Sequence, residues 1–124
     1  MSKHILVVDD DSAILDSIQL ILEQEHYHVV TCSDGRVTAH LKETQPDLLL
    51  LDIWMGTVDG REICKRIKTD ETTKHIPVIM ISASREIIKN SQDSGADDYL
   101  AKPFDIEDLL DKVTRYTTAK KQSS

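Results

Sequence analysis

The sequence predicts an α/β fold in which five parallel strands form one doubly wound sheet with helices on both faces. Two features of the chain support this prediction. Short apolar runs alternate with segments of helical periodicity, which is typical of strands joined by crossover helices. Four consecutive leucines at 48–51 show no polar alternation, which indicates a strand buried on both faces. A chain of 124 residues has room for one such domain.

The first strand is expected at Ile5–Val8, where four apolar residues follow a short polar start. Apolar residues then recur at helical spacing from Ile14 to Leu22, with Asp11 or Ser12 available as the N-cap. This first helix is expected to end near residues 24–25.

The second strand is expected at Tyr27–Cys32, and Asp34-Gly35 supplies a turn after it. A helix through Val37 and Leu41 follows. It must stop before Pro46, because the residue that precedes a proline avoids the helical conformation. The leucine run at 48–51 then supplies the third strand, which we expect in the middle of the sheet.

A loop is expected from Asp52 to Asp59, followed by a helix that carries Ile63, Cys64 and Ile67. The polar segment 69–75 returns the chain to the fourth strand at 78–81.

Between residues 85 and 94 the helical pattern is weak, so we expect this fourth helix to be the most mobile one and to end at Gly95. Tyr99-Leu100-Ala101 is the fifth strand, and an amphipathic last helix begins near Ile106. The whole chain, 1–124, is expected to be a single domain with its core at about 3–117 and a disordered tail at 118–124.

The composition excludes some functions. A formal net charge of -7 argues against a nucleic-acid surface, because phosphate backbones are bound by clustered Lys and Arg. The apolar run at 5–8 is too short for a signal peptide or a membrane span, so a cytoplasmic protein without membrane contact is expected. Cys32 and Cys64 lie in apolar surroundings without metal-ligand spacing, which favours two reduced thiols in the core.

Four strands are followed by, or end on, a polar residue that can take part in chemistry. These residues are Asp9, Asp52, Ser82 and Lys102. In open parallel sheets, ligands bind at the carboxyl ends of the strands where the strand order reverses. A strand order of 2-1-3-4-5 places that reversal between the first and third strands, so that Asp9, Asp10 and Asp52 share one pocket.

Three carboxylates in one pocket repel one another, and a cation relieves that repulsion. A cluster of oxygen ligands without His or thiolate favours Mg²⁺, which also binds phosphoryl oxygens. In such a site the Asp52 carboxylate can attack phosphorus, while Lys102 neutralises charge and Ser82 donates a hydrogen bond. The pattern therefore predicts phosphoryl chemistry.

Four segments resemble, in order and spacing, the response regulator receiver domains of two-component signalling, which belong to the CheY-like superfamily with a flavodoxin-like fold. The matching segments are residues 5–11, 51–55 with 58–60, 77–83, and 95–104. The resemblance runs from Lys3 to about Thr117. It implies a regulatory phosphoprotein that catalyses only its own phosphorylation and dephosphorylation and is otherwise no enzyme.

By this resemblance Asp52 is the phosphoacceptor and also borders the metal. Asp10 is implied to ligate Mg²⁺ directly and Asp9 chiefly through water, with the backbone carbonyl of Trp54 completing the protein ligands. The chain departs from the family at Gly56, where most relatives have Pro, so the loop that carries Trp54 is less restricted.

The resemblance also implies that Lys102 pairs with the phosphoryl group and that the Lys102-Pro103 bond is cis. Ser82 and Tyr99 are implied to be the switch pair that carries the signal to the face made by the fourth helix, fifth strand and last helix. That face would bind an effector or a second copy of the chain, but the sequence does not reveal the output.

The phosphodonor histidine is expected on another protein, a sensor histidine kinase or a histidine phosphotransfer protein. The chain's own histidines are scattered on the expected surface and receive no role. They are His4, His26, His28, His40 and His75.

Two other functions stay open. Asp9-Asp10-Asp11 after an apolar strand is similar to the nucleophile motif of haloacid-dehalogenase phosphatases, with Asp97-Asp98 as a later acidic pair. Ala13 stands where those enzymes have Thr or Val, and the chain lacks room for their cap. The second alternative is a receiver fold that only binds proteins, without phosphorylation.

Overall fold

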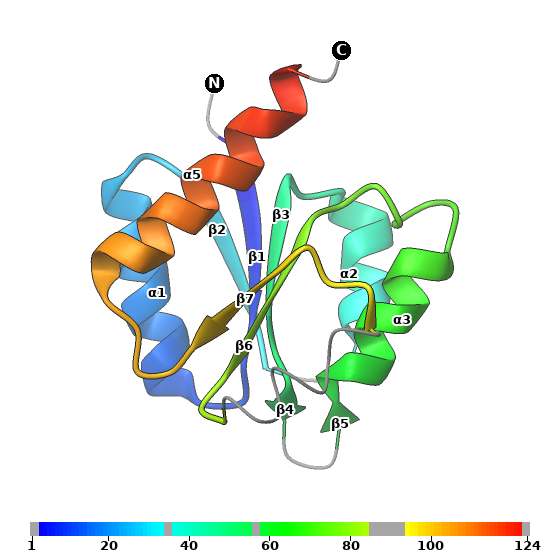
Figure 1. The fold of residues 1–124 in the computed structure, drawn as a ribbon, viewed down its shortest axis with the longest axis horizontal. Helices are drawn as coiled ribbons and strands as arrows, with labels where there is room; N and C mark the ends of the chain where they lie inside the picture. The colour runs from blue at the N-terminus through cyan, green and yellow to red at the C-terminus, as the bar shows by residue number, and fades with distance from the viewer. Residues whose placement is uncertain (1–2, 34–35, 56–57, 85–93, 123–124) are drawn as a thin grey trace.

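The computed structural model describes residues 3–33, 36–55, 58–84 and 94–122, and it contains a five-stranded parallel sheet (Figure 1). The strand order is β2-β1-β3-β6-β7, which is the predicted order of the five core strands. The strands are β1 (His4–Val8), β2 (His28–Cys32), β3 (Leu48–Asp52), β6 (Val78–Ser82) and β7 (Asp98–Ala101).

Helices cover both faces of this sheet. Helix α1 (Ser12–Gln24) and helix α5 (Ile106–Gln122) lie on one face, and α2 (Val37–Thr44) and α3 (Gly60–Thr69) lie on the other (Figure 1). Asp11 is the N-cap of α1, since its carboxylate accepts the backbone N–H groups of Ala13 and Ile14.

Strand β3 is the centre of the core. All four leucines at 48–51 are fully buried; Leu48 and Leu50 pack toward α1 and α5, whereas Leu49 and Leu51 pack toward α2 and α3. Burial on both faces is the reason for the uninterrupted apolar run. Cys32 and Cys64 are buried in the core and form no disulfide with each other, as predicted.

The sequence predicted a loop from Asp52 to Asp59, but this segment contains a small hairpin. Strand β4 (Trp54–Met55) pairs with β5 (Val58–Asp59) in antiparallel register. Two-residue strands are too short to leave a periodic pattern in the sequence, which is why the hairpin was missed.

The predicted disordered tail is also wrong for most of its length, because helix α5 continues to Gln122. Residues 119–122 are Ala-Lys-Lys-Gln, four good helix formers without Gly or Pro, so nothing in them ends the helix. Residues 123–124 lie outside the described part of the chain.

The weak fourth helix predicted at 85–94 falls almost entirely outside the described residues. The chain is described again from Ser94, and Gly95 has a φ of +86°, which glycine adopts without a Cβ clash. Among the described residues, no helix has both the length and the apolar character needed to span a bilayer.

Asp98, at the start of β7, ties this edge strand to α5. Its carboxylate accepts hydrogen bonds from the backbone N–H of Tyr99 at 2.8 Å, from Lys112 Nζ at 3.0 Å and from the Tyr116 hydroxyl at 3.2 Å. Burial raises the pKa of Asp98, but the Tyr99 and Lys112 bonds outweigh it, so the pKa lies below its usual value.

Because the pKa of Asp98 is depressed in the folded state, its ionised carboxylate stabilises the fold. This stabilisation is fully present above the unfolded-state pKa of about 3.9, and it is lost as the pH falls through the folded-state pKa. We expect Asp98→Asn to lower the free energy of unfolding by about 1–2 kcal/mol at neutral pH. The difference from wild type should shrink below about pH 4. Urea unfolding across this pH range measures it, and a difference that does not change with pH would contradict the assignment.

Candidate phosphoacceptor site

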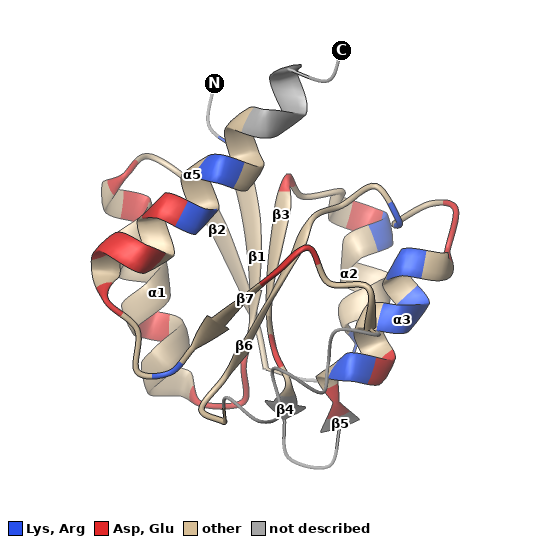
Figure 2. Ribbon diagram, viewed as in Figure 1, with Lys and Arg blue, Asp and Glu red and all other residues tan. Residues whose placement is uncertain are grey.

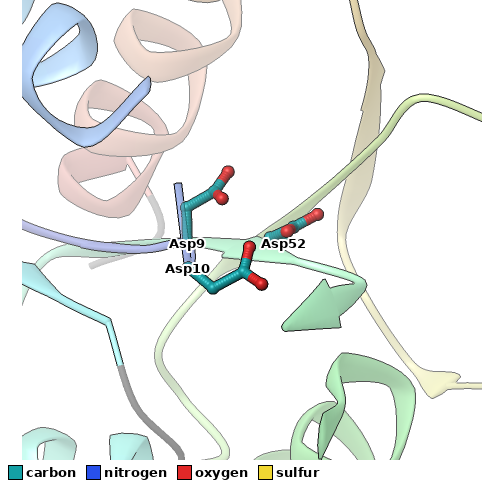
Figure 3. Close-up of side chains that lie close together, drawn as sticks. All are labelled: Asp9, Asp10 and Asp52. Atoms are coloured by element: carbon teal, nitrogen blue, oxygen red, sulfur yellow. The ribbon is translucent and has the colours of Figure 1, made fainter. Parts of the chain in front are cut away.

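The three predicted acidic residues meet at the carboxyl edge of the sheet. Asp9 and Asp10 follow β1 and Asp52 ends β3, and the register pairs Val8 with Leu51. One ligand oxygen from each of the three carboxylates lies within 4.8 Å of the others (Figure 3). The strand order reverses between β1 and β3, so the site lies at the topological switch point, as predicted.

Asp9 is held from two sides. One carboxylate oxygen accepts the backbone N–H of Asp11 at 2.9 Å, and the other accepts a hydrogen bond from Lys102 Nζ at 2.9 Å. Asp9 is 2% exposed and Asp52 6% exposed, whereas Asp10 is exposed to solvent. The cluster therefore has a buried floor and one carboxylate at its mouth.

Lys102 is the cation of the site. Its ammonium lies 2.9 Å from Asp9 Oδ2 and 3.7 Å from Asp52 Oδ1. The backbone N–H of Lys102 donates to the carbonyl of Ser82, and the Lys102-Pro103 peptide bond is cis. Lys102 directly follows β7, and from there its side chain reaches the carboxylates at the ends of β1 and β3.

Ser82 ends β6, next to β3 in the sheet, and is buried. Its hydroxyl oxygen accepts the backbone N–H of Ser84 at 3.1 Å. A hydroxyl has one donor and two acceptor positions, so this bond leaves the O–H of Ser82 to donate elsewhere.

In the described part of the structure, the cluster of three carboxylates has one ammonium beside it, that of Lys102, so these residues carry an excess of negative charge. Figure 2 shows acidic residues at the ends of β1 and β3, whereas basic residues gather along α3. All ligand atoms of the cluster are carboxylate oxygens, which a hard divalent cation such as Mg²⁺ prefers. The residues present therefore fit a magnesium ion.

Gly60 brings α3 directly against the backbone of Asp52 and Ile53. A Cβ at this position would lie 2.9 Å from the Cα of Ile53 and would meet the carbonyl oxygen of Asp52 even more closely. Asp59 caps the same helix and accepts bonds from the backbone and side chain of Arg61. The Arg61 guanidinium holds the pKa of Asp59 below its usual value.

The structure describes the positions of Tyr99 and Trp54 in less detail. Tyr99 lies in β7 opposite Met80, half-buried against the core that faces α2 and α3. Trp54 begins β4, but its side chain and Gly56 lie outside the described part of the structure.

An apolar cavity of about 440 Å³ lies beside Lys102, between α1 and the segment that follows β7, and it was not predicted from the sequence. Its lining consists of Ala13, Ile14, Ser17, Ile18, Ile21, Ala83, Lys102, Pro103 and Phe104. The isoleucines of α1 were predicted only to belong to a helix. Their helical spacing could not distinguish residues that fill the core from partly exposed ones that line a cavity.

Asp97 and Asp98 do not join the acidic cluster. They lie at the start of β7, whereas Asp9 follows the end of β1, and the two strands run parallel in one sheet. Asp97 instead accepts the backbone N–H of Val78 and pairs with Lys68 at 2.7 Å. The acidic pair that the phosphatase alternative requires is therefore at the opposite edge of the sheet.

Comparison with known proteins agrees with this geometry. A family model described as "Response regulator receiver domain" matches residues 5–114. The chain is 46% identical over 113 residues to the DNA-binding dual master transcriptional regulator RpaA of Synechocystis sp., covering 89% of this chain and 47% of that protein. It is 40% identical over 123 residues to the response regulator PleD of Caulobacter vibrioides, covering 97% of this chain and 27% of PleD.

Solved structures show the same fold. A putative response regulator from Chloroflexus aurantiacus matches with a TM-score of 0.89 and 28% identity, over 94% of this chain and 98% of that one. The receiver domain of the sensor histidine kinase PA1611 from Pseudomonas aeruginosa, solved with a magnesium ion in its active-site cleft, matches with a TM-score of 0.86 and 26% identity, over 94% and 98% of the two chains.

The chain spans less than half the length of the two curated relatives named above. The family match nevertheless covers most of the chain, and it coincides with the sheet order and the acidic pocket. This chain belongs to the response regulator receiver domain family of two-component systems.

Proposed function

We propose that this receiver domain takes a phosphoryl group onto Asp52 from a phosphohistidine on a sensor histidine kinase or a histidine phosphotransfer protein. The observation that supports this best is the position of the Lys102 ammonium, 2.9 Å from Asp9 and 3.7 Å from Asp52. A cation at this point neutralises a phosphoryl oxygen on Asp52 without leaving the pocket.

In the transfer, a carboxylate oxygen of Asp52 forms a bond to phosphorus as the bond from phosphorus to the donor's histidine nitrogen breaks. The donor imidazole leaves with the electron pair of the broken bond and takes up a proton from water. Lys102 stabilises charge on the equatorial oxygens, and the O–H of Ser82 donates to one of them.

Asp9, Asp10 and Asp52, with the backbone carbonyl of Trp54, are the groups that would hold Mg²⁺. When bound, the ion supplies positive charge to the phosphoryl oxygens and offsets the repulsion among the carboxylates. Ser82 and Tyr99 act as the switch: the hydroxyl follows the phosphoryl group, and the ring moves inward behind it.

An effector or a second copy of the chain binds the phosphorylated state at the face that contains β7 and α5. The protein acts in the cytoplasm and catalyses only its own phosphorylation and dephosphorylation. The RpaA relative is named as a DNA-binding regulator. In a longer protein of that kind, DNA contacts would belong to residues beyond this chain, whose net charge is -7.

The metal assignment is tested with the chain's only tryptophan as a probe. Adding millimolar Mg²⁺ is expected to change the fluorescence of Trp54, and Asp10→Asn is expected to weaken this response by about tenfold or more, because one direct ligand is lost. Glu107→Gln, an exposed carboxylate on α5, is the matched control. Equal Mg²⁺ titrations for wild type and Asp10→Asn would exclude this position of the metal.

The apolar cavity beside Lys102 is the surface on which a protein phosphodonor can bury side chains close to Asp52. Ile14→Glu is expected to slow phosphotransfer from a kinase by roughly tenfold or more, because a charge at the centre of an apolar contact costs binding energy. Phosphorylation by the small donor acetyl phosphate should be unchanged.

Leu20→Glu is the matched control, since Leu20 lies on the same helix, is 60% exposed and does not line the cavity. It should transfer at the wild-type rate. If Ile14→Glu slows both donors equally, the change acts on the site itself and the docking proposal fails.

A further inference from the structure

Two exposed histidines lie side by side at the end of the sheet opposite the acidic pocket. His4 begins β1, His28 begins β2, and the parallel register makes them direct neighbours. Their ring centroids are 4.6 Å apart, and the ring planes are inclined by 51°. The pair therefore belongs to neither the core nor the proposed phosphoacceptor site.

The main chain fixes both residues. The backbone N–H of His28 donates to the carbonyl of Lys3 at 2.9 Å, and the backbone N–H of His4 donates to Asp47 Oδ2 at 2.8 Å. The backbone N–H of Asp47 in turn donates to the carbonyl of His4 at 2.7 Å. These bonds to the residues that precede β1 and β3 hold the two Cα positions, and the carboxylate of Asp47 adds negative charge beside the backbone of His4.

We propose that His4 and His28 form a bidentate site for a borderline divalent transition metal, with Zn²⁺ as its representative. Zn²⁺ binds imidazole nitrogen at about 2.0–2.1 Å, so one ion can bridge two rings that lie this close together. Imidazole ligands favour Zn²⁺ over Mg²⁺, whereas the carboxylates of the acidic pocket favour Mg²⁺. The ion is bound by one ring from each strand, with water in its remaining positions.

The two metal sites are independent. Strand β1 separates His4 from Asp9 by five residues, which is roughly 16 Å of extended chain, and Figure 1 shows the start of β1 at the opposite end of the sheet from the β4–β5 hairpin. Because Zn²⁺ joins β1 to β2 in the folded state only, it is expected to raise the unfolding temperature.

The test is calorimetric titration of Zn²⁺ into the full chain at saturating Mg²⁺, so that the acidic pocket is occupied. Wild type is expected to bind one Zn²⁺, and both His4→Gln and His28→Gln to bind it at least about tenfold more weakly. His75→Gln, an exposed histidine elsewhere on the surface, should bind like wild type.

Thermal unfolding supplies a second measurement. Zn²⁺ should raise the unfolding temperature of wild type and His75→Gln, but not that of His4→Gln or His28→Gln. Side-chain NMR should show the imidazole signals of His4 and His28 moving together as Zn²⁺ is added. The proposal is overturned if wild type binds no Zn²⁺, or if His28→Gln binds it with wild-type affinity.

Discussion

Replacing Asp52 by Asn is expected to lower phosphoryl incorporation from a histidine kinase or from acetyl phosphate by roughly a hundredfold or more. The amide lacks the nucleophilic oxygen that forms the bond to phosphorus, and loss of a nucleophile removes the chemical step itself. Incorporation of radiolabelled phosphate, followed over time at saturating Mg²⁺, measures the effect.

The same variant should keep its fold. Asp52 is one of three clustered carboxylates, and only it and Asp9 lie within 4.0 Å of the Lys102 ammonium among the described residues. Its neutralisation therefore relieves repulsion, and the unfolding temperature should stay the same or rise. Glu107→Gln removes an exposed carboxylate on α5 and serves as the control for incorporation. If Asp52→Asn, correctly folded, still incorporates phosphate at the wild-type rate, Asp52 is not the acceptor.

Gly60→Ala is expected to be the most damaging small substitution near the site. The added Cβ would lie 2.9 Å from Ile53 Cα and 3.0 Å from Ile53 O, and would also press on the carbonyl of Asp52. These neighbours are backbone atoms, which cannot rotate away, so the strand or the helix must shift. Overpacking of this kind costs about 1–3 kcal/mol, and the shift would displace Asp52, the proposed acceptor.

The variant should therefore lose stability in urea unfolding and phosphorylate more slowly from acetyl phosphate as well. Lys65→Ala, at an exposed position on the same helix, should change the free energy of unfolding by no more than about 0.5 kcal/mol. A Gly60→Ala protein of wild-type stability and phosphorylation rate would show that the contact between α3 and the end of β3 is not tight.

The central part of the fold could be predicted because burial leaves a plain pattern in the sequence. The leucines at 48–51 are apolar without interruption because both faces of β3 are covered. Once β3 is central and β1 lies beside it, the positions of Asp9 and Asp52 at neighbouring strand ends follow from the strand order alone.

Features that depend on the relation between elements were not predictable in the same way. To predict the cavity between α1 and Phe104, one would have to know the distance between two segments that are far apart in the chain. The pairing of Trp54 with Asp59 involves strands that are too short to show a periodic pattern of apolar residues in the sequence. The polar residues 118–124 were predicted to be a disordered tail, so the predicted last helix was too short. Residues 119–122 favour a helix, and α5 continues to Gln122.

The alternatives were separated by geometry. Asp97 and Asp98 are adjacent to each other in the sequence, as the phosphatase motif requires, but they lie at the wrong edge of the sheet and form ion pairs with Lys68 and Lys112. A receiver fold that only binds proteins does not need a lysine ammonium close to Asp9 and Asp52. This leaves phosphorylation as the function to be tested first.

The most direct test is to locate the phosphoryl group on the wild-type chain. The protein is phosphorylated with acetyl phosphate and Mg²⁺, the acyl phosphate is trapped by reduction with borohydride, and the peptides are mapped by mass spectrometry. We predict that the modified residue is Asp52 and that Asp9 is unmodified. Modification at Asp9 would contradict the assignment and would favour a phosphatase-like nucleophile.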